Sequence, residues 1–191
     1  EELKNFRAAS FPFLIENFLP KFYFQHCVKT YFISDLVCKE LQGLYSNTAF
    51  TTVILTAWLV YLYRLGNQES LGVGFYECSD LKIILSELSP FFSRKLPFSV
   101  CLEGEMNFSQ AVQCVEKKRN LLEEHCTYDH SVFHRYVSLF NQIKSFPLAI
   151  LITDNPEIEL QRKGADSLIT LILSTDGKKI ACFTDAQILK Q

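Results

Sequence analysis

Apolar residues recur along the chain at two spacings, one typical of strands and one typical of helices. Runs rich in β-branched and aromatic residues predict strands over 21–33, 71–76, 94–102, 147–153, 168–174 and 179–183. Periodic apolar positions predict helices over about 35–43, 48–65, 107–124 and 131–143, and the first turns of another over 185–191. Because the two kinds of element are intermixed, we predict the α/β class (mixed α+β), with a mixed β-sheet backed by helices.

Three of these helices begin at residues that can cap a helix. Ser34 precedes the first helix and Asn47 the second, and either side chain can accept a backbone N–H. Asn107 followed by Gln110 has the form of a capping box. The helix over 48–65 is apolar nearly all round, so we expect it to be buried. The helix after Asn107 instead carries one apolar stripe, made of Phe108, Ala111, Val112, Val115 and Leu122.

Glycine and proline positions refine the strands. Pro97 cannot donate to a ladder, so its strand is expected at a sheet edge or at a bulge. Asp176-Gly177 separates the last two strands and predicts a hairpin turn. Gly72 and Gly74 follow a helix and lie inside a strand, whereas a phosphate-binding loop needs glycines after a strand and before a helix. They indicate a strand that a neighbour approaches closely.

The composition is that of a globular protein, with 191 residues, 48% hydrophobic and 21% charged. We predict one domain over 1–191, with 1–20 as a lead-in segment. Nineteen Lys and Arg against 21 Asp and Glu leave no basic surplus for phosphates, so we expect no nucleic-acid partner. The longest apolar stretch, Val53 to Tyr63, is too short for a bilayer span of about 20 residues. An acidic, polar start in place of a signal peptide favours a cytoplasmic protein without membrane contact.

Aromatic and sulfur residues add two expectations. Seventeen Phe and 8 Tyr are many for this length and indicate a surface that a partner covers. The seven cysteines are widely spaced and form no C-x-x-C pair, which is unlike a disulfide framework or a zinc ribbon. We expect them to be buried, reduced thiols.

Histidines supply the densest reactive cluster. His130 and His134 have the spacing of two zinc ligands on one helix face, but no Glu lies between them to act as a base. A helix end with polar flanks explains them better. Adjacent His26-Cys27 and His125-Cys126 point to different sides of an element, which argues against a Cys–His nucleophile. We expect no metal ligand and no catalytic pair.

Several segments, taken in order, match one known pattern. Residues 56–74 run from a Trp-bearing helix through Arg-Leu-Gly-Asn-Gln into a Val/Gly strand. Further matches lie at 89–98, at 107–124, at 131–137 and at 145–153. Together they resemble nonribosomal peptide synthetase condensation domains over about 45–185, in the second, C-terminal lobe. The resemblance implies one lobe of a chloramphenicol acetyltransferase-like fold.

The departures from that family bear on chemistry. Its catalytic H-H-x-x-x-D-G motif lies in the first lobe, and no His-His pair occurs in this chain. Ser93-Arg94 stands where the family has Asn-Thr, Val132 and His134 replace the Pro and Glu of V-P-F-E, and Asn141-Gln142 replaces Arg-Asp. The comparison makes Ser93 and Arg94 candidates to face the substrate channel, whereas Trp58 is expected to pack in the core.

The resemblance leaves two functions open. The first is a partial or degenerate condensation domain, not catalytic by itself, that serves as a structural and docking platform for an adjacent adenylation domain. The second is the acceptor-side half of an active condensation domain whose catalytic lobe lies outside this chain, and which forms peptide bonds between carrier-bound substrates. Both imply adenylation and peptidyl carrier domains as partners, with phosphopantetheine on the carriers and no cofactor bound by this chain directly. An unrelated small α/β protein is a third interpretation.

Overall fold

The computed structural model describes residue 9 and residues 26–66, 70–77, 95–102, 104–125, 146–154 and 167–185. The strands are β1 (His26–Phe32), β2 (Leu71–Glu77), β3 (Leu96–Val100), β4 (Leu148–Thr153), β5 (Ile169–Ser174) and β6 (Lys179–Asp185). The helices are α2 (Asp35–Leu44), α3 (Phe50–Gly66) and α5 (Phe108–His125). The predicted helix over 131–143 lies outside the described residues, as do residues 186–191.

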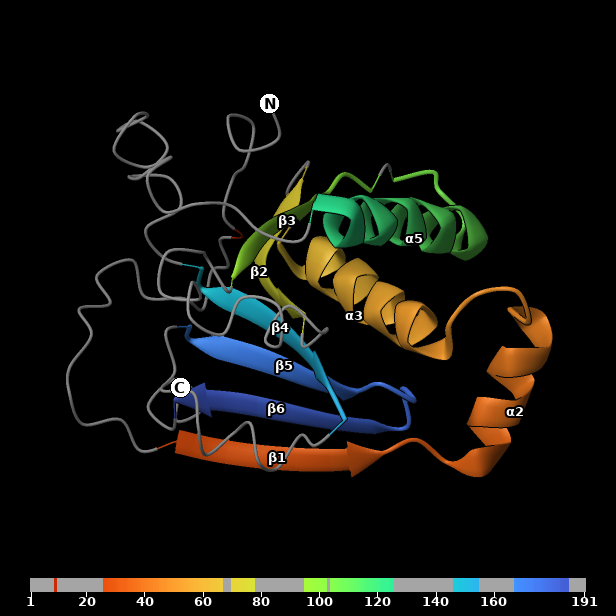
Figure 1. Ribbon diagram of the computed structural model, residues 1–191, viewed down its shortest axis with the longest axis horizontal. Helices are drawn as coiled ribbons and strands as arrows, with labels where there is room; N and C mark the ends of the chain where they lie inside the picture. The colour runs from red at the N-terminus through yellow and green to blue at the C-terminus, as the bar shows by residue number, and fades with distance from the viewer. Residues whose placement is uncertain are drawn as a thin grey trace.

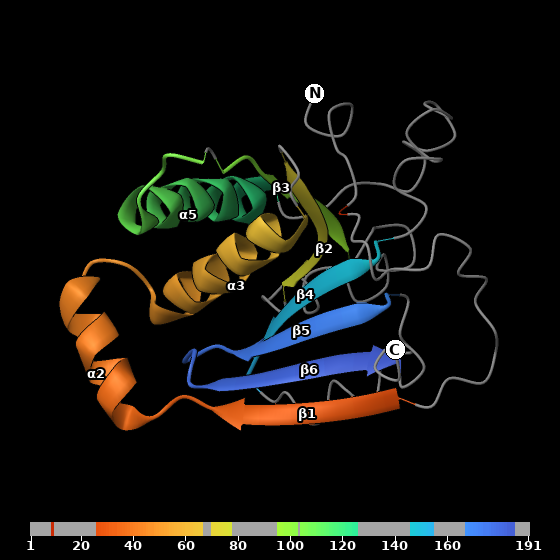
Figure 2. The same cartoon turned by 180° about the vertical axis from the view of Figure 1, so that it is seen from behind.

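The six strands form one mixed sheet in the order β1-β6-β5-β4-β2-β3. The strand β4 runs parallel to β2 and to β5, and the remaining pairs are antiparallel. The helices α3 and α5 lie side by side on one face of the sheet, and α2 stands beyond the end of β1 (Figures 1 and 2). The predicted mixed sheet backed by helices is confirmed.

Alternation along the strands places two sets of side chains on opposite faces. On the helix-facing side, Leu71, Val73 and Phe75 of β2 join one buried cluster with residues of α3 and α5. Phe75 and Phe98 meet there with ring centroids 5.3 Å apart. The far face carries the other set, which includes a small buried group of Leu151, Ile172 and Ala181. The strands of the sheet centre are thus buried on both faces.

The first two turns of α3 are buried, from Phe50 to Thr56. Asn47, which we predicted as the cap, lies in a turn, and the helix begins only at Phe50. The hydroxyl of the buried Thr56 donates to the Thr52 carbonyl at 2.7 Å, so this polar side chain is satisfied within the helix. The expected burial all round fails in the second half, where Tyr61 and Leu65 are exposed.

The predicted caps of the other two helices are confirmed. The Val37 N–H donates to Ser34 Oγ at 3.4 Å at the start of α2. In α5 the Gln110 N–H donates to Asn107 Oδ1 and the Asn107 N–H donates to Gln110 Oε1, both at 2.9 Å, which closes the capping box. Of the predicted apolar stripe, the three middle residues are buried and the two outer ones are half-buried.

The Asp176-Gly177 turn joins β5 to β6 as predicted. Gly177 has a φ of 71°, and a Cβ there would lie 2.7 Å from the Phe50 ring. The pKa of Asp176 is lowered, chiefly because the Ser174 hydroxyl and then the Lys178 N–H donate to its carboxylate. The prediction of a helix starting at Asp185 is wrong at that residue, because the backbone pairing of β6 with β1 extends to it.

The cysteine expectation holds only in part. Among the cysteines of the described ranges, Cys38, Cys101, Cys114 and Cys182 are thiols outside any disulfide. Cys38 is buried, but Cys101 is exposed, and Cys114 and Cys182 are half-buried. The predicted burial is therefore wrong for Cys101, which follows directly after the last residue of β3.

Candidate binding site on the far face of the sheet

A glycine opens a notch on the far face of β2. The side chains of Leu71, Val73 and Phe75 point to the helices, so Gly74 and Tyr76 fall on the opposite side. A Cβ on Gly74 would lie 2.7 Å from Lys95 Cδ and 2.8 Å from Phe146 Cγ. The lysine and the ring therefore occupy space that any other residue at position 74 would fill, which confirms the close approach expected for this strand.

Lys95 crosses this notch and ends among polar and aromatic groups. Its ammonium lies 5.0 Å from the centroid of the Tyr76 ring and 5.5 Å from that of the Phe146 ring. The Nζ atom donates to Ser167 Oγ at 3.1 Å. Three segments that are distant in sequence thus contact one lysine, which is half-buried, while Ser167 and Phe146 are buried.

This surrounding suits a fixed positive charge. The faces of the two rings attract the positive charge of the ammonium. The hydroxyl of Ser167 accepts a proton-bearing nitrogen without adding charge of its own.

The sequence analysis predicted site residues next to Lys95 in the chain, but not Lys95 itself. Ser93 and Arg94, the candidates for the substrate channel, lie outside the described residues. Lys95 directly follows them in the chain and immediately precedes the edge strand β3, and we did not single it out. The signal that could have found it is the pair of glycines in β2, since a notch in one strand indicates a side chain laid across it from the next.

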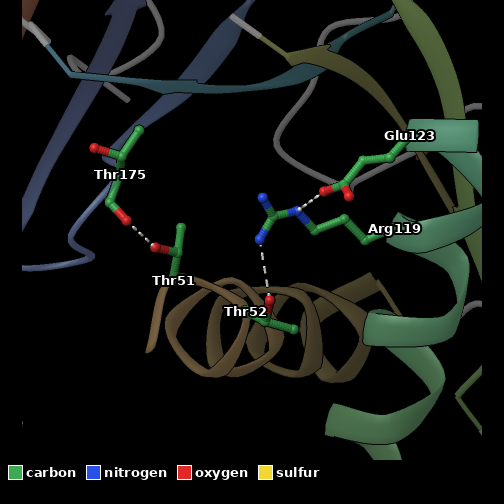
Figure 3. Close-up of polar contacts among 5 residues, drawn as sticks. All are labelled: Thr51, Thr52, Arg119, Glu123 and Thr175. Atoms are coloured by element: carbon green, nitrogen blue, oxygen red, sulfur yellow. Dashed lines mark hydrogen bonds and ion pairs between the residues drawn. The ribbon is translucent and has the colours of Figure 1, made fainter. Parts of the chain in front are cut away.

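A second polar group lies on the helix side and joins three elements (Figure 3). Thr51 Oγ1 donates to the Thr175 carbonyl at 2.6 Å, which ties the start of α3 to the β5–β6 turn. Arg119 of α5 donates to Thr52 Oγ1 at 3.1 Å and pairs with Glu123 at 3.1 Å. These bonds satisfy buried hydroxyls between packed elements, so we assign them a structural role.

The outer side of α5 carries a shallow hollow of about 320 Å³. It is lined by Gln113, Glu116, Lys117, Asn120, Leu121 and Glu124. All six belong to one helix, and their charges are of both signs. Among the described residues, its lining brings together no groups from different elements, unlike the setting of Lys95.

Of the other residues that the sequence singled out, some lie in the described part of the chain and some do not. Trp58 packs, half-buried, against the helix-side core, as expected. His130 and His134 lie outside the described residues, and so do Val132 and the pair at 141–142. Within the described ranges, no three His, Cys, Asp or Glu side chains gather as ligands of a metal ion would. Of the helices described, none has the length and apolar character needed to cross a membrane.

Comparison with known proteins relates this fold to one class. No protein-family model and no curated protein matches the sequence. Solved structures match well. A holo four-domain nonribosomal peptide synthetase bound to AMP and glycine shares 10% identity with this chain at a TM-score of 0.62. The match covers 94% of this chain and 15% of that one. An X-domain in complex with OxyB from teicoplanin biosynthesis shares 11% identity at 0.62, with 87% of this chain covering 42% of that chain. The starter condensation domain of rhizomide synthetase shares 13% identity at 0.53, with 88% of this chain covering 40% of that one.

These similarities define the fold. The described residues have the chloramphenicol acetyltransferase-like fold of condensation domains, and the chain spans less than half the length of each of these three structures. The partial coverage is consistent with a C-terminal lobe, as the resemblance in the sequence implies. At such low identity the likeness carries the fold and leaves activity to be argued from the residues.

Proposed function

We propose that this chain is the C-terminal lobe of a condensation-type domain and acts as a structural and docking platform for an adenylation domain, without forming peptide bonds by itself. One observation carries the proposal: the fold of a condensation domain extends over almost the whole chain, while no His-His pair occurs in its 191 residues. A general base beside the acceptor amine is what the family motif supplies, and this lobe does not contain that motif.

The neighbouring structures support a role in assembly. One is a four-domain synthetase, and another is an X-domain that was solved in complex with a second protein, OxyB. Both place a fold of this kind next to another folded unit. The exposed apolar residues of this chain, among them Tyr61 and Leu65 on α3, offer surface for such contacts.

The second candidate function is the acceptor-side half of an active domain, and the setting of Lys95 favours it. The Lys95 ammonium, which contacts two rings and the Ser167 hydroxyl, would contribute positive charge toward an anion such as the phosphate of a carrier's phosphopantetheine arm. Ser93 and Arg94, the candidates that the sequence offers for the channel, directly precede it in the chain. In this arrangement the chain would bind and orient the arm, and the proton transfer would belong to a separate lobe.

A turnover assay distinguishes the two functions. The full chain is mixed with aminoacyl and peptidyl carrier proteins, and dipeptidyl product is measured against carriers alone, first without and then with a separately expressed condensation-domain lobe that contains H-H-x-x-x-D-G. The platform proposal expects no product in either mixture. Product that requires both chains, and that falls with Lys95→Met, would establish the acceptor-side role, whereas product from this chain alone would refute both.

Docking is measured directly by calorimetric titration against the peptide-synthetase adenylation domains encoded in the same genome. We expect saturable binding to at least one of them and none to an unrelated domain of similar size. Failure to bind any of them contradicts the platform proposal, whatever the turnover assay gives.

A further inference from the structure

The edge strand β1 is exposed from Val28 to Phe32. All five residues from Val28 to Phe32 are exposed, and they include three large apolar side chains. Seven consecutive residues pair with β6 without a bulge, and none is Pro or Gly. Edge strands are usually shielded by a proline, a bulge, short length or inward-pointing charge, and β1 has only Lys29 as such a guard. No described strand lies beyond it (Figure 2).

The direction of the β1 backbone follows from one hydrogen bond. The Ile33 N–H donates to the Lys178 carbonyl at 2.9 Å and continues the ladder between β1 and β6. In an antiparallel pair, alternate residues direct their N–H and C=O groups to the same side. Tyr31 and Lys29 therefore share the inward direction of Ile33. The backbone groups of Val28, Thr30 and Phe32 face outward, away from β6.

These outward groups match a second copy of the same strand. In an antiparallel pair about a two-fold axis at Thr30, Thr30 lies opposite Thr30, and Val28 lies opposite Phe32. All three outward residues then exchange hydrogen bonds with outward residues of the other copy. Threonine pairs and pairs of an aromatic with a β-branched residue are favourable across strands, and Lys29 comes opposite a Tyr31 ring.

The neighbouring registers of self-pairing are less favourable. An axis at Lys29 places two lysines directly opposite each other, which is destabilising. An axis at Tyr31 places Val28 opposite Ser34, which lies beyond the strand. The sequence of β1 thus favours one register of self-pairing over the others.

The area that such pairing covers sets its strength. Tyr31 and Phe32 expose 56% and 75% of their surface. With about 200 Å² for each aromatic side chain, two copies can cover at most about 500 Å² of aromatic surface. Stable interfaces bury at least about 1,200 Å² in total, so the pair belongs to the weak, concentration-dependent class.

We propose that β1 is a self-association edge, which pairs antiparallel with β1 of a second copy of this chain in the register that sets Thr30 opposite Thr30. The two sheets then continue into one another across the dimer. The contact is independent of the docking function proposed above, because it needs no synthetase partner.

Sedimentation of the full chain from low to several hundred micromolar concentration tests this. The wild type is expected to rise from 22.0 kDa toward twice that mass. Thr30→Lys and Thr30→Glu each place like charges opposite one another and should remain monomeric, and an equal mixture of the two should recover the dimer. Thr30 is exposed, so both variants should keep the wild-type unfolding midpoint.

Recovery in the mixture separates a contact at Thr30 from damage to the fold, because a misfolded variant would not be rescued by another. The control Leu44→Lys changes an exposed apolar residue of α2 and should dimerise like the wild type. A wild type that stays monomeric throughout, or two charged variants that each dimerise as well as the wild type, would overturn the proposal.

Discussion

The sheet ends in two edge strands with contrasting surroundings. In β3, Leu96, Phe98 and Val100 are buried, and α5 packs against them. In β1, every residue from Val28 to Phe32 is exposed, although the strand is longer and pairs regularly with β6. The helices α3 and α5 lie over the β3 side of the sheet and leave the β1 side uncovered (Figures 1 and 2).

This contrast teaches that one edge strand of a sheet can be buried in the core while the other is exposed. Pro97 removes one donor from β3, and its alternate side chains are committed to the core. The strand β1 contributes backbone pairing but almost no apolar burial of its own. We therefore expect the energetic weight of the two edges to differ sharply, and the predictions below test that difference.

Truncation of one aromatic residue on each edge should give the largest contrast. Phe98→Ala removes a ring that is 1% exposed and packs on Phe75, so unfolding should cost about 3–5 kcal/mol less. Phe32→Ala removes a ring that is 75% exposed and should change stability by no more than about 0.5 kcal/mol. Chemical denaturation in dilute solution measures both, and equal losses would erase the distinction between the edges.

Glycine substitutions sharpen the same comparison at intermediate size. Gly74→Ala places a methyl group against Lys95 and Phe146 beside β3, and should destabilise the fold by about 1–3 kcal/mol. Gly43→Ala, in the helix that follows β1, meets no atom within 4 Å and should stabilise by about 0.5–1 kcal/mol. Thermal unfolding of the two variants gives the signs, and a neutral Gly74→Ala would mean that Lys95 moves aside freely.

The smallest expected effect is on stability at acid pH, and it comes from Asp176 in the turn beside the end of β1. The folded-state pKa of Asp176 lies below its ordinary value of 3.8, so its carboxylate stabilises the fold at neutral pH, and this contribution is lost as pH falls through the folded pKa. Asp176→Asn should therefore lose less stability than the wild type between about pH 6 and the acid limit. Urea unfolding at both ends of this range measures the difference, and parallel curves would contradict it.

Local patterns predicted most of the elements, because each depends on neighbours in the chain. The Asn107–Gln110 capping box and the Asp176-Gly177 turn need only a few adjacent residues, and both formed as predicted. Pro97 indicated an edge because the missing donor is a property of the residue itself. The errors fall where the pattern was ambiguous: Asn47 resembles a cap as well as a turn residue, and Asp185 resembles a helix start although it extends a strand.

Local sequence patterns could not predict the contacts around Lys95. Lys95, Tyr76, Phe146 and Ser167 come from four separate segments, and no spacing in the chain announces that they meet. Gly74 gave a partial signal, since it predicted a close approach without naming the side chain that makes it. The exposure of Cys101 was also missed, because the hydrophobic tendency of a residue type does not tell where the helices stop covering the sheet.

The amino-acid sequence alone predicted most of the helices and strands and a mixed sheet backed by helices, and it shows that no His-His pair occurs in this chain. Only the tertiary structure decided which edge of that sheet is covered, and which lysine is held between two rings. The reason is physical: periodicity and capping act over one or two turns of chain, whereas burial and cation–aromatic contacts depend on where distant segments come to rest.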